Sequence, residues 1–406
     1  MTFLPPIFEL NAFVVFGVLI LLGLIGGVMA HKSMLFPRIT AFMLVGLVFG
    51  PSGLDWVNTE MIANGKVFID IALGMIMFNL GRTLNLGALR QLKGIYASSA
   101  AEIVLTFGFI ALGFLAFGAH WLSALLVAAI GISASPAITM MVIQEFNAKG
   151  PVVTRTLPLL ALNNLGAFAV FTALLPLIYI SQHTGTAGWT DIATMVLHPL
   201  YLIAGSFALA YAIYTLARLV LHSRFGGADL SAFPLLVGVL AFGIGFSVVL
   251  GLSAMLTNLF LGMMVANLRH TEKLREEGFG AQEEIFLIIL FVLAGAKLHL
   301  EEVGQYLGWA ILFVVLRGAG KLVALTACQP LTGSTLKQNI GITGMLTPMA
   351  GLAIGLTQMT ESLFPTVGRN LATLILAGVA ILETIGPLVS EWALKWNKEI
   401  RGKIEH

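Results

Sequence analysis

The chain has 406 residues, of which 58% are hydrophobic and 10% are charged, and its mean hydropathy is +0.95. Soluble globular proteins carry about 25% charged residues, so the composition excludes that class and indicates a polytopic membrane protein. The net charge of +2 gives no sign of nucleic-acid binding, and the single cysteine, Cys328, excludes an intrachain disulfide framework and a cysteine-rich metal site.

The first apolar run opens a series of membrane segments. No basic stretch precedes this run and no small-residue cleavage site follows it, so we predict a retained helix rather than a signal peptide. Crossing a bilayer takes roughly 20 apolar residues, and runs of about that length recur along the chain. We predict an all-α polytopic membrane protein with about thirteen transmembrane helices. The segments lie at residues 10–30, 35–51, 66–82, 93–117, 121–145, 152–181, 190–221, 231–249, 251–269, 282–299, 304–329, 335–359 and 368–396.

The basic residues indicate the orientation of these segments. When the loops are numbered alternately, one set holds 17 of the 22 Lys and Arg residues and the other set holds three. The remaining two, Arg317 and Lys321, lie inside a predicted helix. Because cytoplasmic loops carry the excess of basic residues, we predict a multi-pass protein of the cell (inner) membrane, with the N-terminus outside and the C-terminus in the cytoplasm.

The fifth and twelfth segments are interrupted. Each contains a Ser/Thr-Pro step in mid-membrane, at Ser135-Pro136 and at Thr347-Pro348, among Gly, Ser and Thr residues. Proline removes a helical hydrogen bond, and backbone freed in this way is tolerated at membrane depth only where protein or a water-filled cavity satisfies it. A proline kink explains either step alone. Because the two steps lie seven segments apart, an odd number, they predict the inverted repeats of a transporter with its site near the midplane.

Four ionisable residues lie deep in predicted helices, where charge is costly and by default suggests function. They are Glu102, Arg317, Lys321 and Glu383. The repeat pairs the segment of Glu102 with that of Arg317 and Lys321, so structural ion pairs between the repeats are one interpretation. Arginine stays charged and suits a structural clamp. Buried lysine and glutamate exchange protons, which makes Glu102 and Lys321 the better candidates for proton-coupled transport.

Several stretches, taken in order, carry a resemblance to a known family. They are "FPRITAFMLVGLVFGPSGL", "SASPAITMMVIQEF", "GLSAMLTNLFLGMMVANL", "FLIILFVLAGAKLHL", "RGAGKLVAL" and "ILETIGPLV". Their order and spacing resemble the monovalent cation:proton antiporter superfamily, in its bacterial sodium/hydrogen exchanger-like branch. The likeness covers nearly the whole chain.

The resemblance implies a thirteen-helix homodimer in which a core domain of six helices, two of them broken and crossing, moves like an elevator against a scaffold. Some relatives carry a C-terminal nucleotide-sensing domain, which we do not expect here. The implied divisions are scaffold and dimer domain at 1–88 and 226–303, core transport domain at 89–182 and 304–396, a connecting helix at 183–225 and a cytoplasmic tail at 397–406.

The sixth segment departs from the family pattern. Members usually carry Asp-Asp or Asn-Asp there, and the second Asp binds ion and proton; this chain has Asn163 and Asn164. The lysine that pairs with the first Asp in electrogenic members resembles Lys321. An amide coordinates a cation through its carbonyl oxygen but cannot carry a proton, so a coupled transporter needs another carboxylate.

Glu102 is the first candidate for that carboxylate and Glu383 the second. Glu102 lies in the implied core, where the spacing of Ser98, Glu102 and Thr106 places them on one helix face. Neutral oxygen ligands suit Na⁺ or K⁺. The candidate ion ligands are Asn163, Asn164, Ser133, Ser135, Thr139 and Thr347.

The residues and the resemblance together predict a secondary active transporter that exchanges Na⁺ or K⁺ for H⁺ with a relocated proton carrier. Two alternatives stay open. Without aspartates, Arg317 and Lys321 leave a net positive core that suits an anion or organic acid, and a transport-incompetent relative would serve as a sensor or assembly partner. We do not expect an enzyme, since no nucleophile–base pair, metal cluster or nucleotide-binding loop stands out. We also expect no cofactor and no nucleic-acid partner.

Overall fold

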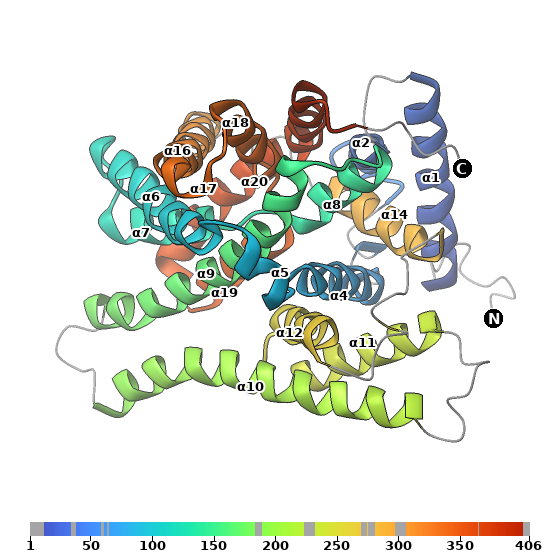
Figure 1. Ribbon diagram of the computed structural model, residues 1–406, viewed down its shortest axis with the longest axis horizontal. Helices are drawn as coiled ribbons and strands as arrows, with labels where there is room; N and C mark the ends of the chain where they lie inside the picture. The colour runs from blue at the N-terminus through green and yellow to red at the C-terminus, as the bar shows by residue number, and fades with distance from the viewer. Residues whose placement is uncertain are drawn as a thin grey trace, which may run out of the picture. The chain divides into compact units, whose positions relative to one another are not determined.

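The computed structural model describes residues 12–33, 38–57, 61–62, 65–182, 189–222, 232–268, 274, 281–296, 306–363 and 365–400. Helices are the regular structure of this part of the chain (Figure 1), and the predicted all-α fold is confirmed. The helices are α1 (Ala12–Ser33), α2 (Arg38–Phe49), α4 (Lys66–Thr83), α5 (Leu86–Gln91), α6 (Ile95–Ala116), α7 (Trp121–Gly131), α8 (Pro136–Glu145), α9 (Pro151–Gln182), α10 (Trp189–His222), α11 (Ala232–Val249), α12 (Ala254–Asn267), α14 (Ala281–Ala296), α16 (Leu307–Ala327), α17 (Gln329–Thr332), α18 (Leu336–Met345), α19 (Gly351–Leu363) and α20 (Pro365–Asn397).

The predicted segments follow these helices closely. Each of the thirteen overlaps one helix or a pair of helices separated by a short break. By length and hydropathy alone, six helical stretches among the described residues are long and apolar enough to cross a membrane. The number of thirteen crossings therefore remains a prediction.

The chain divides into two compact units, and the division falls within α4. The first unit comprises residues 1–72 and 278–301, in which α1, α2 and α14 pack together. Glycines bring two of these helices into backbone contact: a Cβ added at Gly46 would lie 2.0 Å from the carbonyl oxygen of Val292, and one at Gly295 would lie 2.0 Å from that of Met43. Small residues of this kind permit close helix packing in lipid.

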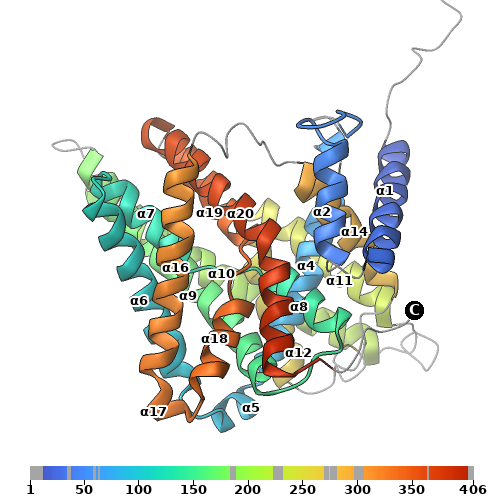
Figure 2. The ribbon, with the colours of Figure 1, turned by 90° about the horizontal axis from the view of Figure 1, so that it is seen from above.

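The second unit comprises residues 73–277 and 302–406 and contains the two broken helices. In it α6 lies beside α16, α9 packs on α7 and α18, and α20 packs on α16, α18 and α19 (Figure 2). The scaffold and core boundaries implied by the resemblance differ from these units and remain a prediction.

The neighbours α6 and α16 run in opposite directions. The thiol of Cys328 donates to the carbonyl of Ala97 near one end of the pair. Towards the other end, a Cβ at Gly113 would meet the side chain of Leu316 at 2.3 Å. As numbers rise along α6 they fall along α16, which agrees with inverted repeats.

Proline and its neighbours define the two breaks. Pro136 is the first residue of α8, where its missing N–H costs nothing, and the hydroxyl of Ser135 caps that helix by accepting from the backbone N–H of Ile138. The second break separates α18 from α19 and contains Pro348. The breaks touch each other, since the backbone N–H of Ser135 donates to the carbonyl of Pro348 at 2.8 Å.

Glu399, two residues after the end of α20, contacts the start of α9. The carboxylate of Glu399 accepts from the backbone N–H groups of Val152 (2.8 Å) and Val153 (3.1 Å), and its backbone carbonyl accepts from Lys149 (3.0 Å). Glu399 is only 5% exposed. A carboxylate at a helix N-terminus satisfies unpaired N–H groups and complements the helix dipole. Glu399, the third residue of the predicted tail, therefore caps the helix that carries Asn163 and Asn164.

We expect Glu399→Ala to lower the free energy of unfolding by about 1–2 kcal/mol, the usual cost of losing a helix N-cap. Lys395→Ala is the matched control, because it removes the ion pair between Lys395 and Glu391 (2.5 Å). The side chain of Lys395 is 59% exposed, and an exposed ion pair contributes at most about 1 kcal/mol. Thermal unfolding in detergent measures both. Equal effects of the two substitutions would show that the Glu399 cap is not stabilising.

Candidate functional site

Arg317 ties the two helix breaks together. It lies in α16 and is 1% exposed. Its guanidinium donates to four backbone carbonyls, two from each break: Gly131 (2.9 Å), Ser133 (2.6 Å), Leu346 (3.0 Å) and Thr347 (2.8 Å). These carbonyls stand at the C-terminal ends of α7 and α18, which carry negative partial charge. The cation thus neutralises two helix ends at once.

Lys321, one turn after Arg317 in α16, forms an ion pair with Glu102 of α6. Both side chains are 0% exposed, and the ammonium of Lys321 donates to Oε1 of Glu102 and to the carbonyl of Ile132 (3.2 Å). Gly320 permits the close approach, because a Cβ there would lie 2.7 Å from Cα of Thr106. Each charge is buried only because the other compensates it.

Asn163 completes the surroundings of this carboxylate. Its amide Nδ2 donates to Oε2 of Glu102, while its Oδ1 accepts from the hydroxyl of Ser99 at 2.8 Å. Glu102 therefore receives one donor on each oxygen, from Lys321 and from Asn163. Lysine and the amide NH₂ are donors only, so the arrangement fits an ionised glutamate. We call Glu102, Lys321 and Asn163 the buried cluster.

Asn164 has a different task from its neighbour. Its Oδ1 accepts from the backbone N–H of Ala134 and its Nδ2 donates to the carbonyl of Ala134, both at 3.0 Å. Ala134 lies in the break between α7 and α8, where the helical ladder leaves these groups unpaired. An amide offers a donor and an acceptor together, whereas a carboxylate offers acceptors only. Asn164 thus stabilises the break between α7 and α8 by satisfying both backbone groups of Ala134.

We expect Asn164→Asp to destabilise the protein at high pH and less so at low pH. The protonated acid reproduces the donor and acceptor that Ala134 needs, but the carboxylate would face its carbonyl oxygen. The unfolding temperature should be compared with wild type between pH values of about 9 and about 3, a range that contains the ordinary pKa of aspartate, about 3.9. Asn164→Leu is the control, and its unfolding temperature should lie equally far below that of wild type at both pH values. If the unfolding temperature of Asn164→Asp also stays equally far below wild type at both pH values, the role given to this amide is contradicted.

The hydroxyls predicted as ion ligands are all bonded to backbone groups. Three donate to carbonyl oxygens, and that of Ser135 caps α8. A hydroxyl that donates keeps lone pairs for a cation, so their role as ligands remains a prediction. The three donor–acceptor pairs are Ser133 to Ile130 (2.7 Å), Thr139 to Met345 (2.8 Å) and Thr347 to Thr343 (3.0 Å).

Glu383, the second predicted carrier, lies buried in α20 with 4% of its surface exposed. Gly386 follows it by one turn and packs against the second break, where a Cβ would lie 2.9 Å from Cα of Pro348. Glu383 is therefore within one helical turn of the crossing, on a different helix from either partner of the buried ion pair.

Ser99 was not selected from the sequence. The spacing of Ser98, Glu102 and Thr106 indicates one face of α6, yet the residue that contacts Asn163 is Ser99. Ser99 precedes Glu102 by three residues, a spacing that also makes helical neighbours, and this is the signal that could have found it. Thr106 is buried, and its hydroxyl makes no hydrogen bond within the described part of the chain.

Comparisons with known proteins agree with this geometry. The sequence model of the family described as "Sodium/hydrogen exchanger, transmembrane" matches residues 17–396. The chain belongs to the sodium/hydrogen exchanger family. That family consists of membrane transporters rather than enzymes, in keeping with the expectation that the chain is not an enzyme.

The exchanger fold is also found among solved structures. The sodium proton antiporter MjNhaP1 from Methanocaldococcus jannaschii at pH 8 aligns with a TM-score of 0.67 at 14% identity, covering 96% of this chain and 98% of that one. An electron-microscopy structure of the same protein gives 0.72 at 15% identity, covering 98% and 100%. A search of curated proteins gives no match. At these identities the structural likeness establishes the fold.

Proposed function

We propose that the chain is an antiporter that exchanges a monovalent cation, Na⁺ or K⁺, for a proton carried by Glu102. The observation that supports this most is the buried cluster: an ion pair with 0% exposure stands where two broken helices cross, in a chain of the sodium/hydrogen exchanger family. Intramembrane charges are costly and mark ion paths and proton relays. The similar fold of MjNhaP1 belongs to a protein described as a sodium proton antiporter.

The exchange step follows from competition for one carboxylate. Ionised Glu102 attracts either the ammonium of Lys321 or a cation that displaces it, with the carbonyl oxygen of Asn163 and nearby hydroxyls as neutral ligands. When Glu102 takes up a proton it becomes neutral, and the attraction for the cation is lost. Cation and proton therefore bind alternately, which is the condition for exchange.

We propose an elevator movement for the step that carries the site across the membrane. Arg317 supports this, because its four bonds join both breaks and allow them to move as one body. The moving core would comprise residues 89–182 and 304–396, against a scaffold that forms a homodimer. The distribution of Lys and Arg favours placement in the cell membrane with the C-terminus in the cytoplasm.

The contacts of the two basic residues disfavour the anion alternative. Arg317 donates to four backbone carbonyls, and Lys321 is paired with Glu102. An anion would have to displace these partners. The positive charge of the core is thus already balanced by helix ends and by a carboxylate.

A flux assay tests the proposed function. The protein is reconstituted in liposomes with a trapped pH dye, a proton gradient is imposed, and Na⁺, K⁺ or Li⁺ is added. We expect at least one of these cations to dissipate the gradient. If the wild-type protein is silent to all three, cation/proton exchange is wrong, and the anion transporter or the non-transporting relative takes its place.

A further inference from the structure

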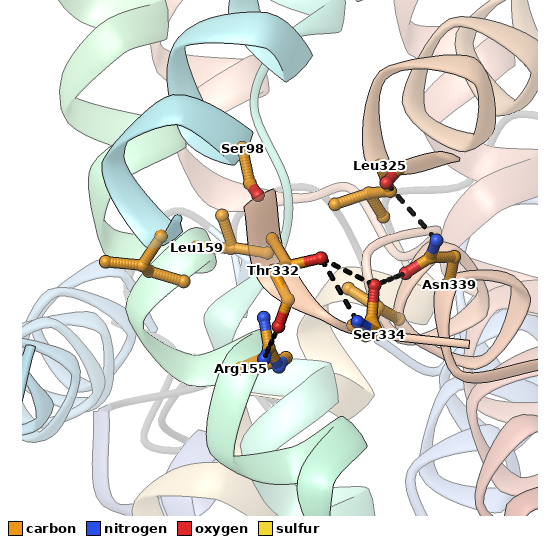
Figure 3. Close-up of a pocket in the computed structure, with 9 residues that line it drawn as sticks. Ser98, Arg155, Leu159, Leu325, Thr332, Ser334 and Asn339 are labelled. Atoms are coloured by element: carbon orange, nitrogen blue, oxygen red, sulfur yellow. Dashed lines mark hydrogen bonds between the residues drawn. The ribbon is translucent and has the colours of Figure 1, made fainter. Parts of the chain in front are cut away.

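A small cavity lined by both polar and apolar residues lies inside the helix bundle near one end of α6, α9 and α16 (Figure 3). Its volume is about 10 Å³, room for about one water molecule, and it lies partly open between these helices, α17 and α18. A chain of hydrogen bonds runs along its wall. The bonds join Arg155 to the carbonyl of Thr332 (2.7 Å), Thr332 to Ser334 (2.8 Å), Ser334 to Asn339 (2.7 Å), and Asn339 to the carbonyl of Leu325 (3.2 Å). Polar groups in the wall of a cavity of this size provide the partners that one buried water molecule needs.

The cavity lies one helical turn from the buried cluster on three helices at once. Ser98 precedes Glu102 by four residues in α6, Leu159 precedes Asn163 by four in α9, and Leu325 follows Lys321 by four in α16; all three line the cavity. Four residues span about 6 Å along a helix. Since α16 runs opposite to α6, these steps lead in one direction, and the cluster forms the layer next to the cavity.

Ser98 is the polar residue in the layer that separates the cavity from the cluster. Leu159 and Leu325 are 1% and 3% exposed, and Ile342 of α18, at 2%, is equally apolar. The hydroxyl of Ser98 points toward the cavity, and no hydrogen bond joins it to the other lining residues in Figure 3. It shares its helix face with Glu102. A water molecule at this hydroxyl would therefore connect the cavity with the carboxylate.

We propose that this cavity is a chamber for a water molecule that delivers protons to Glu102 and that Ser98 relays them. In the relay step, a protonated water molecule in the cavity donates a proton to the Ser98 oxygen. The original hydroxyl proton of Ser98 passes, through one further water molecule, to the Glu102 carboxylate. One proton moves and the hydroxyl is restored. The relay given to Ser98 rests on the proposed function of Glu102 as proton carrier.

The chamber belongs to the cytoplasmic end of the bundle in the orientation predicted from the basic residues. The loops that flank it follow α5, α8 and α17, and carry Lys93 and Lys149, with Lys337 just beyond. Cytoplasmic loops hold the excess of Lys and Arg. Protons should therefore enter and leave Glu102 through this chamber when the site communicates with the cytoplasm.

The matched pair Ser98→Val and Ser98→Thr tests the relay, because the two side chains have nearly the same shape and differ in the hydroxyl. We expect Ser98→Val to lower the exchange rate by about 100-fold, the usual size of a lost proton-transfer group, and Ser98→Thr to recover most of that loss. Both variants are first checked for the wild-type unfolding temperature. Equal rates for the two variants would overturn the relay.

A labelling experiment tests the chamber without measuring transport. Ser98→Cys is prepared with Cys328→Ala, which removes the native cysteine, and oriented vesicles are treated with a small membrane-impermeant methanethiosulfonate from one side at a time. We expect labelling from the cytoplasmic side. Labelling from the outside alone, or from neither side, contradicts the chamber. If the wild type lacks exchange the proposed function fails, whereas the labelling result still decides whether the chamber exists.

Discussion

Glu102→Gln is expected to abolish cation/proton exchange and to destabilise the protein, and a second substitution, Lys321→Met, is expected to restore the stability but not the exchange. Removing the negative charge leaves the ammonium of Lys321 buried without its carboxylate, since both side chains are 0% exposed. Breaking a buried ion pair in this way costs about 3–5 kcal/mol.

The double variant separates structure from transport. Replacing both partners of a buried ion pair by neutral side chains of similar volume is often neutral or stabilising, so Glu102→Gln with Lys321→Met should unfold near the wild-type temperature. It has no group at this place that can carry a proton, so its exchange rate should stay at the background of empty liposomes.

Thermal unfolding in detergent and the dye-based flux assay are measured on the same preparations of wild type, both single variants and the double variant. A double variant that is stable and also exchanges cations for protons would show that the pair is only structural. Glu383→Gln is then the next variant to assay, because Glu383 is the other buried carboxylate close to the crossing.

Much of the fold could be predicted because its causes are local in the sequence. Hydrophobic length locates the helices, and the chemistry of proline locates both breaks: Pro136 begins α8, and Pro348 lies between α18 and α19. The intramembrane charges also indicate where the site lies. Segment boundaries were accurate to a few residues because polar or small residues follow each apolar run.

The partners within the site could not be predicted, because they come from distant parts of the sequence. Asn164 pairs with the backbone of Ala134, 30 residues away, and Glu399 caps α9 across 247 residues. A backbone group has no signature in the sequence. For the same reason the four carbonyls that receive Arg317 were not foreseen, although its role as a clamp was proposed from the chemistry of arginine.

Arg317→Gln is expected to have the second large effect, a loss of about 3 kcal/mol or more in the free energy of unfolding together with loss of exchange. The substitution leaves carbonyls of both breaks without donors, at about 1–3 kcal/mol for each unsatisfied group, and removes the charge that faces two helix C-termini. Arg317→Lys should lie between it and wild type, because an ammonium keeps the charge but offers three donors from a single point.

Arg155→Gln is the control for this effect, since Arg155 also donates to a backbone carbonyl, that of Thr332 at 2.7 Å, but is only partly buried. The free energy of unfolding of Arg155→Gln should fall by about 1 kcal/mol.

The Arg317→Gln variant also tests the transport step, because it leaves Glu102 and Lys321 unchanged. If the elevator movement needs the two breaks to move as one body, Arg317→Gln should lack exchange even at temperatures where it remains folded. Normal exchange by folded Arg317→Gln would mean that the breaks move independently of this clamp, and the transport step would then have to be assigned to the helices around Glu102 alone.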